Sequence, residues 1–263
     1  MTFLMSYWKS GRGLTIRKMK VFDFEIVDSL PCLYHKELDL LVISDVHLGL
    51  EGSVTSKGGY VPKFQLDEII EDLENAKKET KASRILVNGD LKNEFNKNYY
   101  SEKKEVDKFL KELKKLFDEV IIVEGNHDNF LDEIVGKNGL EIKPRYVENS
   151  ILFTHGHKDP DDVDKFETVV IGHEHPALSL EDEIGVVEKV DSLVYGKTKN
   201  GVRIIVLPAF SSISNGTRIN ETPQQELLSP VLRNHVDLGS MKAVAVSRDA
   251  GVFEFPELSK INQ

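Results

Sequence analysis

Histidine and oxygen-bearing side chains recur in five short motifs of this sequence. Six of the eight histidines fall within four of these motifs, and the remaining motif is a Gly-Asp pair. In chain order the motifs are Asp45-Val46-His47, Gly89-Asp90, Gly125-Asn126-His127-Asp128, His155-Gly156-His157 and Gly172-His173-Glu174-His175. Imidazole, carboxylate and amide donors in this combination are typical of a hydrolytic site for two divalent metals. We therefore predict a metal-dependent hydrolase.

The residue types exclude several other metal chemistries. Cys32 is the only cysteine, which rules out a zinc finger, an iron–sulfur cluster and a disulfide framework. Each motif alone has a plainer explanation: an Asp-x-His pair is commonly a capped turn, and Asn126 or Asp128 could cap a helix. Five motifs in this order favour metal binding over those local explanations.

Apolar runs of strand length precede the motifs. We predict buried strands at residues 38–44, 84–87, 120–123, 151–154 and 168–171. Amphipathic helices are expected at residues 63–79 and 101–117, between the first three of these strands. Ligands in open α/β sheets bind beyond the carboxyl ends of the strands. The motifs should therefore converge on one crevice.

The C-terminal part predicts a second, more antiparallel sheet. Its strands are expected at residues 185–190, 192–195, 202–207, 242–247 and 252–255, with a short helix at 225–234. Met5 and Met19 are alternative start sites. We accordingly divide the chain into an N-terminal extension, residues 1–19, and a single domain, residues 20–263.

Charge and hydropathy limit the partners. A formal charge of −10 argues against a protein coated with a basic nucleic-acid surface. It does not exclude a nuclease, because two divalent ions would add about four positive charges at the phosphate site. No apolar run reaches the length of about 18 residues that spans a membrane. With one thiol, the chain is expected in the cytoplasm.

The ordered motifs, from Asp45 to His175, resemble the signature of the calcineurin-like metallophosphoesterases: D-x-H, GD, GNH followed by an acid, His, and GHxH. The resemblance implies an α/β fold, a four-layer α/β/β/α sandwich of two mixed sheets. The phrases ISDVHLG, GDLKNEF, GNHD, GHEHP and LPAFSS are most similar to the archaeal SbcD-related (ICC-like) phosphoesterases. That finer likeness extends over residues 38–215.

The resemblance also implies the metal ligands. It assigns Asp45, His47, Asp90 and His175 to a first ion, and Asp90, Asn126, His155 and His173 to a second. Asp90 would bridge ions about 3.5–4 Å apart, and a shared water or hydroxide would attack phosphorus in line with the departing oxygen. Manganese is the expected metal, with iron(II), zinc or nickel as alternatives.

Four further residues are expected around the metals. The resemblance places His127 outside the ligands, facing the substrate as a general acid at the leaving group. Asp128 is expected to orient His127 or a ligand, although helix capping fits it equally well. Asn93 is expected to contact substrate. His157, two residues after His155, is expected to contact substrate or to support the ligands, with metal ligation as the alternative. Family members often carry Asp or His in place of Asn93, so its role stays open.

The leading hypothesis is a two-metal phosphodiesterase acting as a DNA or RNA nuclease. The alternative is a phosphoesterase for a small nucleotide or another small phosphodiester, which the acidic charge favours. An inactive scaffold is the third hypothesis, disfavoured because no motif residue is lost. A helicase, ATPase or ligase partner and a homodimer are compatible with the resemblance.

Overall fold

The chain folds around two β-sheets, each with parallel and antiparallel strands. The computed structural model describes residues 19–51, 64–95, 100–181 and 185–261. The first sheet runs, in spatial order, β1 (Lys20–Val21), β2 (Phe24–Ile26), β3 (Leu33–His35), β4 (Leu40–Ile43), β5 (Arg84–Asn88), β6 (Glu119–Val123) and β7 (Ile142–Lys143). Strands β1 to β4 pair antiparallel and β4 to β7 parallel. Helices connect the parallel strands, as parallel crossovers commonly require.

The second sheet comes from the C-terminal half. It runs β14 (Thr217–Arg218), β11 (Pro176–Glu181), β12 (Val187–Lys197), β13 (Arg203–Val206), β10 (Thr168–Ile171), β9 (Ile151–Phe153) and β8 (Tyr146–Glu148), while β15 (Lys242–Ser247) pairs with β12 and β16 (Gly251–Glu257). Strands β9, β10 and β13 are parallel. Antiparallel pairs join β11 to β12, β12 to β15, and β15 to β16.

Alternating side chains along the central strands divide the interior into separate cores. In β4, Leu41 and Ile43 pack under the helices, whereas Leu40 and Val42 pack against the second sheet. In β10, Val170 faces the first sheet and its neighbours on either side face outward. Successive strand residues point to opposite faces, so each fully apolar strand serves two cores.

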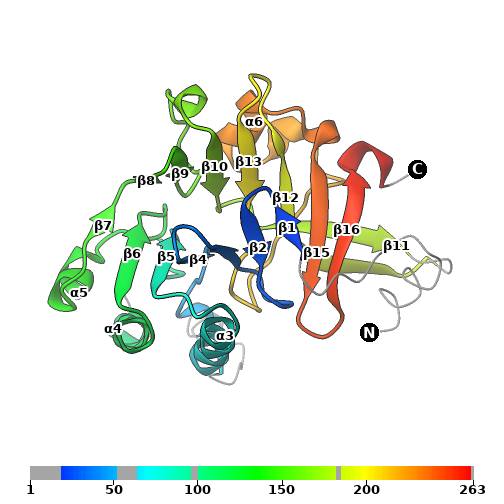
Figure 1. Cartoon of the computed structure of the whole chain (residues 1–263). Helices are drawn as coiled ribbons and strands as arrows, with labels where there is room; N and C mark the ends of the chain where they lie inside the picture. Colours follow the sequence, from blue (N-terminus) through cyan, green and yellow to red (C-terminus); the bar gives the residue numbers. More distant parts are fainter. Residues whose placement is uncertain (1–18, 52–63, 96–99, 182–184, 262–263) are drawn as a thin grey trace.

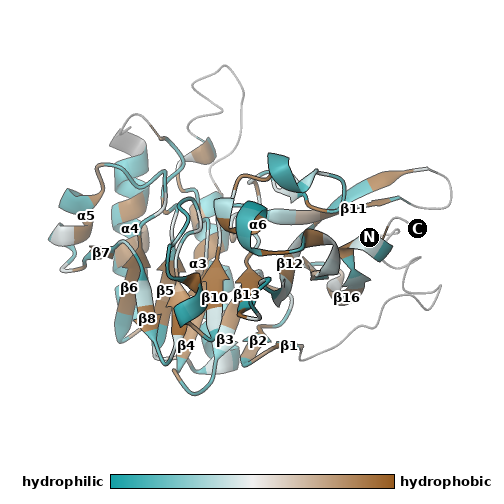
Figure 2. Ribbon diagram, turned by 90° about the horizontal axis from the view of Figure 1, so that it is seen from above, coloured by the Kyte–Doolittle hydropathy of each residue, from teal (hydrophilic) through white to brown (hydrophobic). Residues whose placement is uncertain are grey.

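Helices cover the outer faces of both sheets (Figure 1). Helices α3 (Gln65–Thr80), α4 (Tyr100–Leu116) and α5 (Asp132–Lys137) lie on the first sheet. The second sheet carries α6 (Pro230–His235). Short 3₁₀ helices are η1 (Val163–Lys165), η2 (Gln224–Glu226), η3 (Leu238–Ser240) and η4 (Leu258–Lys260). Figure 2 shows the hydrophobic colouring on the central strands. The α/β/β/α sandwich of two mixed sheets is confirmed.

Two C-terminal predictions are wrong. Residues 185–190 and 192–195 were expected as separate strands, but both contribute to β12, which is continuous from 187 to 197. Its first half pairs with β11 and its second half with β13 and β15. The helix expected at 225–234 is divided into η2 and α6, because the chain is extended at Leu227 and Ser229. Pro230 then begins α6, a position that tolerates its missing N–H.

The two longer helices lie close to their predicted limits. Helix α4 spans 100–116 against the predicted 101–117, and α3 spans 65–80 against 63–79. Residue 63 lies outside the described part of the chain, as do residues 1–18 of the expected extension.

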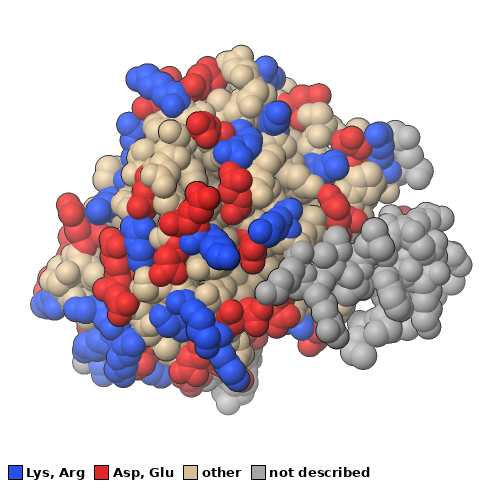
Figure 3. Space-filling view, in the orientation of Figure 1, with Lys and Arg blue, Asp and Glu red and all other residues tan. Residues whose placement is uncertain are grey.

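No helix among the described segments combines the length and apolar character needed to cross a membrane. On the face drawn in Figure 3, basic and acidic side chains are interspersed over most of the surface. On this face the basic side chains form no continuous coat, and the whole sequence has 44 acidic against 34 basic residues.

Candidate metal centre

The five motifs meet where strands of both sheets end. Asp45 follows β4, Asp90 follows β5, and residues 125–128 follow β6, all in the first sheet. His155 follows β9 and His173 follows β10, both in the second sheet. The predicted convergence at the carboxyl ends of strands is therefore present, with each sheet supplying part of the site.

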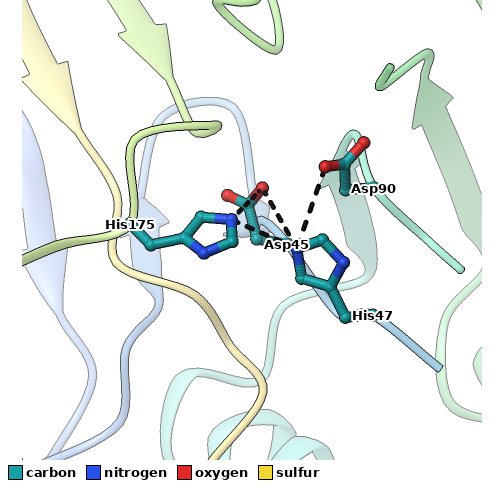
Figure 4. A group of neighbouring side chains, drawn as sticks. All are labelled: Asp45, His47, Asp90 and His175. Atoms are coloured by element: carbon teal, nitrogen blue, oxygen red, sulfur yellow. Dashed lines mark hydrogen bonds and ion pairs between the residues drawn. The ribbon is translucent and has the colours of Figure 1, made fainter. Parts of the chain in front are cut away.

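The first ligand group contains Asp45, His47, Asp90 and His175 (Figure 4). Their potential ligand atoms all lie within 4.8 Å of one another. The His175 Nε2 atom is 2.8 Å from Asp45 Oδ1, and His47 Nε2 is 3.8 Å from Asp90 Oδ2. Two carboxylates and two imidazoles thus point at one position.

The second ligand group contains Asp90, His155 and His173, again within 4.8 Å. His155 Nε2 lies 3.3 Å from Asp90 Oδ2 and 3.2 Å from the amide oxygen of Asn126. Asn126 thus places a neutral oxygen beside this group. Asp90 belongs to both groups, as a bridging carboxylate would.

The donors fit divalent cations. His155 Nδ1 lies 3.0 Å from the carbonyl of Asn88, which can only accept, so Nδ1 carries a proton and Nε2 faces the site, where a bound cation would replace the second proton. Ser214 Oγ similarly lies 3.2 Å from His175 Nδ1. The Nε2 atoms of His47 and His175 are 3.1 Å apart. Nitrogens about 2.1 Å from one ion would be about 3 Å apart at a right angle.

The electrostatics also suit a cation. Burial opposes ionisation of Asp45, but His175 and His155 hold its pKa below the ordinary value. Burial likewise opposes ionisation of Asp90, and His155 with His47 lowers its pKa. Both carboxylates are nearly inaccessible to solvent, at 0% and 2% exposure. Buried negative charges of this kind require a positive partner.

The histidines divide into two charge states. Burial favours the neutral form of His155, but Asp90 and Asp45 raise its pKa to about 9. Burial and neighbouring histidines lower the pKa of His47 and of His173 to about 4, which leaves both neutral at pH 7. Neutral imidazole is the form that binds metal.

The family assignment follows from sequence and structure together. The calcineurin-like phosphoesterase family matches residues 38–238, which include both ligand groups. The chain belongs to the calcineurin-like phosphoesterases. It is therefore a metal-dependent phosphoesterase, and the two groups are its candidate metal-binding residues.

A solved nuclease structure shares the fold at low identity. The nuclease MPE of Pseudomonas putida aligns with a TM-score of 0.59 and 15% identity, covering 89% of this chain and 94% of the nuclease. YfcE, a phosphoesterase from E. coli, aligns with a TM-score of 0.38 and 15% identity, covering 84% of this chain and 94% of YfcE. No curated protein sequence matches the chain.

Several of the candidate metal-binding residues have a left-handed backbone conformation. Asp45, His47, Asp90, His173 and His175 all have φ between 45° and 66°. Such a conformation disfavours residues with a Cβ and persists only where the surroundings impose it. The backbone therefore aims these side chains before any ligand binds.

Glycine in two motifs permits close approach to the ligands. A Cβ on Gly125 would overlap the backbone nitrogen and Oδ1 of Asp90, and a Cβ on Gly172 would overlap Ser44 and Asp45. The glycines thus bring the carboxylates of neighbouring loops against the backbone. Their presence beside ligand residues is the sequence signal for this packing.

His127 lies at the exposed edge of the site. Its side chain is 29% exposed, and its Nε2 is 3.9 Å from Asp90 Oδ2. Its Nδ1 is 2.5 Å from the carbonyl of Asn93, so Nδ1 carries a proton and Nε2 is the atom free to exchange one. The backbone N–H of His127 donates to Asp90 Oδ1. The imidazole belongs to neither ligand group among the described residues.

Asp128 supports the motif loops by contacts to the backbone. Its buried carboxylate accepts the N–H groups of Leu91 and Gly125, at 2.7 and 2.8 Å. Burial and the nearby charge of Asp90 raise its pKa to about 6. The N-cap of α5 is Leu131, so the capping alternative for Asp128 is wrong. The carboxylate ties together the loops that carry Asp90 and His127.

Asn93 and His157 lie beside the two ligand groups. Asn93 contributes its backbone carbonyl to His127, and its N–H donates to the carbonyl of Leu48 and to Glu102 Oε1. The ring of His157 is centred 5.3 Å from that of His155. Within the described part of the chain, His157 Nδ1 is buried without a hydrogen-bond partner. Both residues adjoin the site; their contact with substrate stays a prediction.

Gln65 is a supporting residue that sequence analysis missed. Its buried amide nitrogen lies 3.1 Å from the carbonyls of both Val46 and His47 and 2.9 Å from Ser211 Oγ. It therefore holds the backbone of the first motif. No spacing rule connects residue 65 to residue 47; its place at the start of α3, within an otherwise apolar inner face, was the only signal.

Replacing Gln65 with leucine is expected to lower the free energy of unfolding by about 2 kcal/mol, because buried carbonyls lose their donor. Urea denaturation of the metal-free protein measures this change. Gln225→Leu is the matched control, since Gln225 is exposed, and should shift stability by less than about 0.5 kcal/mol. Equal stability of the two variants would contradict the supporting role of Gln65.

Proposed function

We propose that this phosphoesterase is a two-metal phosphodiesterase that cleaves DNA or RNA. The observation that carries the proposal is the position of Asp90, whose carboxylate belongs to both ligand groups. One carboxylate shared between two groups favours two adjacent ions over isolated single sites. Manganese is the proposed metal, because the donors combine carboxylate, imidazole and an amide oxygen.

The protein would supply positioning, charge and a proton. Bound divalent ions would polarise the phosphoryl group and activate water. Asp45 and Asp90 contribute only two negative charges, and Asn126 adds a neutral oxygen, so the site keeps a positive surplus for a phosphate. His127 holds one proton on Nδ1 against Asn93 and can deliver another from Nε2 to the departing oxygen.

Two observations support a nucleic acid as substrate. The structure shares its fold with a nuclease from Pseudomonas putida. The sequence phrases around the motifs are most similar to SbcD-related phosphoesterases. The net charge of −10 favours the second candidate, a small nucleotide diester, because a polymer normally requires an extended basic surface.

The substrate class is tested by comparing polymers with small diesters. With manganese, labelled single- and double-stranded DNA and RNA are expected to be cut, and chelation of the metal should abolish the cutting. Bis-p-nitrophenyl phosphate reports basal diesterase activity in the same preparation. Hydrolysis of nucleotides alone, with every polymer intact, would replace the nuclease assignment by the small-substrate one.

Compartment, domain organisation and partners complete the proposal. We infer a cytoplasmic enzyme, a single catalytic domain over residues 20–263, and specificity supplied in part by a helicase, ATPase or ligase partner or by a homodimer. The burial of Cys32, the only thiol, is compatible with a reducing compartment.

A further inference from the structure

An exposed aromatic ring lies against the proposed acid. The ring of Phe95 is centred 5.7 Å from that of His127, at an interplanar angle of 81°. Phe95 is 44% exposed, although a phenylalanine gains free energy from burial. Isolated exposed apolar residues are common on proteins, but this one lies against the residue that we propose as the general acid.

The segment before Phe95 is firmly attached to the site. The N–H of Asn93 donates to the carbonyl of Leu48 at 2.9 Å, and the N–H of Glu94 donates to Glu102 Oε1 at 2.9 Å. Glu102 is itself buried in the first turn of α4. The backbone immediately before Phe95 is therefore held by hydrogen bonds to Leu48 and Glu102. These contacts fix the position from which the Phe95 ring extends.

We propose that Phe95 is a stacking platform for the nucleobase on the leaving side of the scissile phosphate. The inference rests on the proposed phosphodiesterase function. A departing oxygen that receives its proton from His127 Nε2 must approach that ring, and its nucleoside then lies beside Phe95. Aromatic side chains stack on every base, because each base has a π-face.

The charge of the protein makes such a platform useful. Proteins that bind nucleic acid mainly through phosphates need many basic groups, and this chain carries ten more acidic than basic residues. Stacking provides affinity that does not depend on a basic surface. It also favours unpaired bases, since a base within a duplex has both faces covered.

The test compares dithymidine phosphate with the analogue in which the leaving nucleoside is an abasic tetrahydrofuran residue. Binding of the phosphorothioate forms to the manganese-loaded enzyme is measured by calorimetry, and cleavage of the phosphodiester forms by chromatography. The wild-type enzyme should prefer the base-bearing ligand by about 5- to 150-fold, equivalent to about 1–3 kcal/mol. Phe95→Leu should bring this preference close to one, and Phe95→Trp should retain it.

Two outcomes would overturn the platform. If the wild-type enzyme binds the base-bearing and abasic ligands equally, the base contributes no binding energy, and Phe95 does not stack on it. A Phe95→Leu enzyme that weakens both ligands by the same factor would show that the ring only positions His127. A different result would contradict the proposed phosphodiesterase function: no diester would be hydrolysed with any metal. The binding preference for the base could still be measured in that case.

Discussion

Replacing His127 with alanine is expected to lower kcat about 10²- to 10⁴-fold while the protein keeps its metal ions. Among the described residues, the imidazole lies outside both ligand groups, and its Nε2 is the ring nitrogen that does not contact Asn93. Alanine preserves the backbone N–H that donates to Asp90. The substitution therefore removes the proton donor and leaves the ligands in place.

Metal analysis and a leaving-group series measure this effect. The loss in kcat should be larger for an alkyl phosphodiester than for bis-p-nitrophenyl phosphate, because nitrophenolate departs readily without a proton. His235→Ala is the matched control: His235 pairs with Asp159 and lies outside every motif. A His127→Ala enzyme with nearly normal kcat on the alkyl ester would refute the acid assignment.

Replacing Asp90 with alanine should abolish both metal binding and turnover. Its Oδ2 atom is 3.3 Å from His155 Nε2 and 3.8 Å from His47 Nε2, so one substitution removes a ligand from each group. We expect kcat to fall by at least about 10³-fold, since two-metal chemistry requires both ions. Metal content should fall below one ion per chain.

A surface carboxylate provides the control for Asp90. Asp23 is 57% exposed and pairs with Arg203, so Asp23→Ala removes a charge without touching the site. This variant should retain wild-type metal content and kcat. If Asp90→Ala also retained both ions, the bridging position would be wrong even if activity were lost.

The candidate metal-binding residues could be predicted because their positions in the sequence follow a topological rule. Apolar strands ending at Asp45, Asp90 and His155 require polar residues beyond their carboxyl ends to share one crevice. The glycines beside the candidate ligands let the motif loops pack closely, which the structure shows at Gly125 and Gly172. The change in strand pattern after residue 175 predicted a second sheet, but that sheet also contains β8, β9 and β10, which precede residue 175.

The supporting contacts were not predictable from types and spacing. Gln65 donates to backbone carbonyls of a motif that lies earlier in the sequence. Asn93 contacts His127 through its backbone carbonyl, a group that does not depend on the residue type. Glu102, in α4, fixes that segment through two backbone N–H groups. Such contacts depend on how loops from different strands pack. Sequence analysis predicted two strands in place of β12. No local pattern shows that one strand pairs with β11 along its first half and with β13 and β15 along its second half.

The central claim, catalysis by two ions that share Asp90, is tested most directly by titrating metal-stripped protein with manganese. Bound manganese and hydrolysis of bis-p-nitrophenyl phosphate are followed in the same samples. Hydrolysis should be absent at the start and should reach its maximum as the second ion per chain binds. Full activity with one bound ion, or activity that survives complete removal of metal, would contradict the two-metal site.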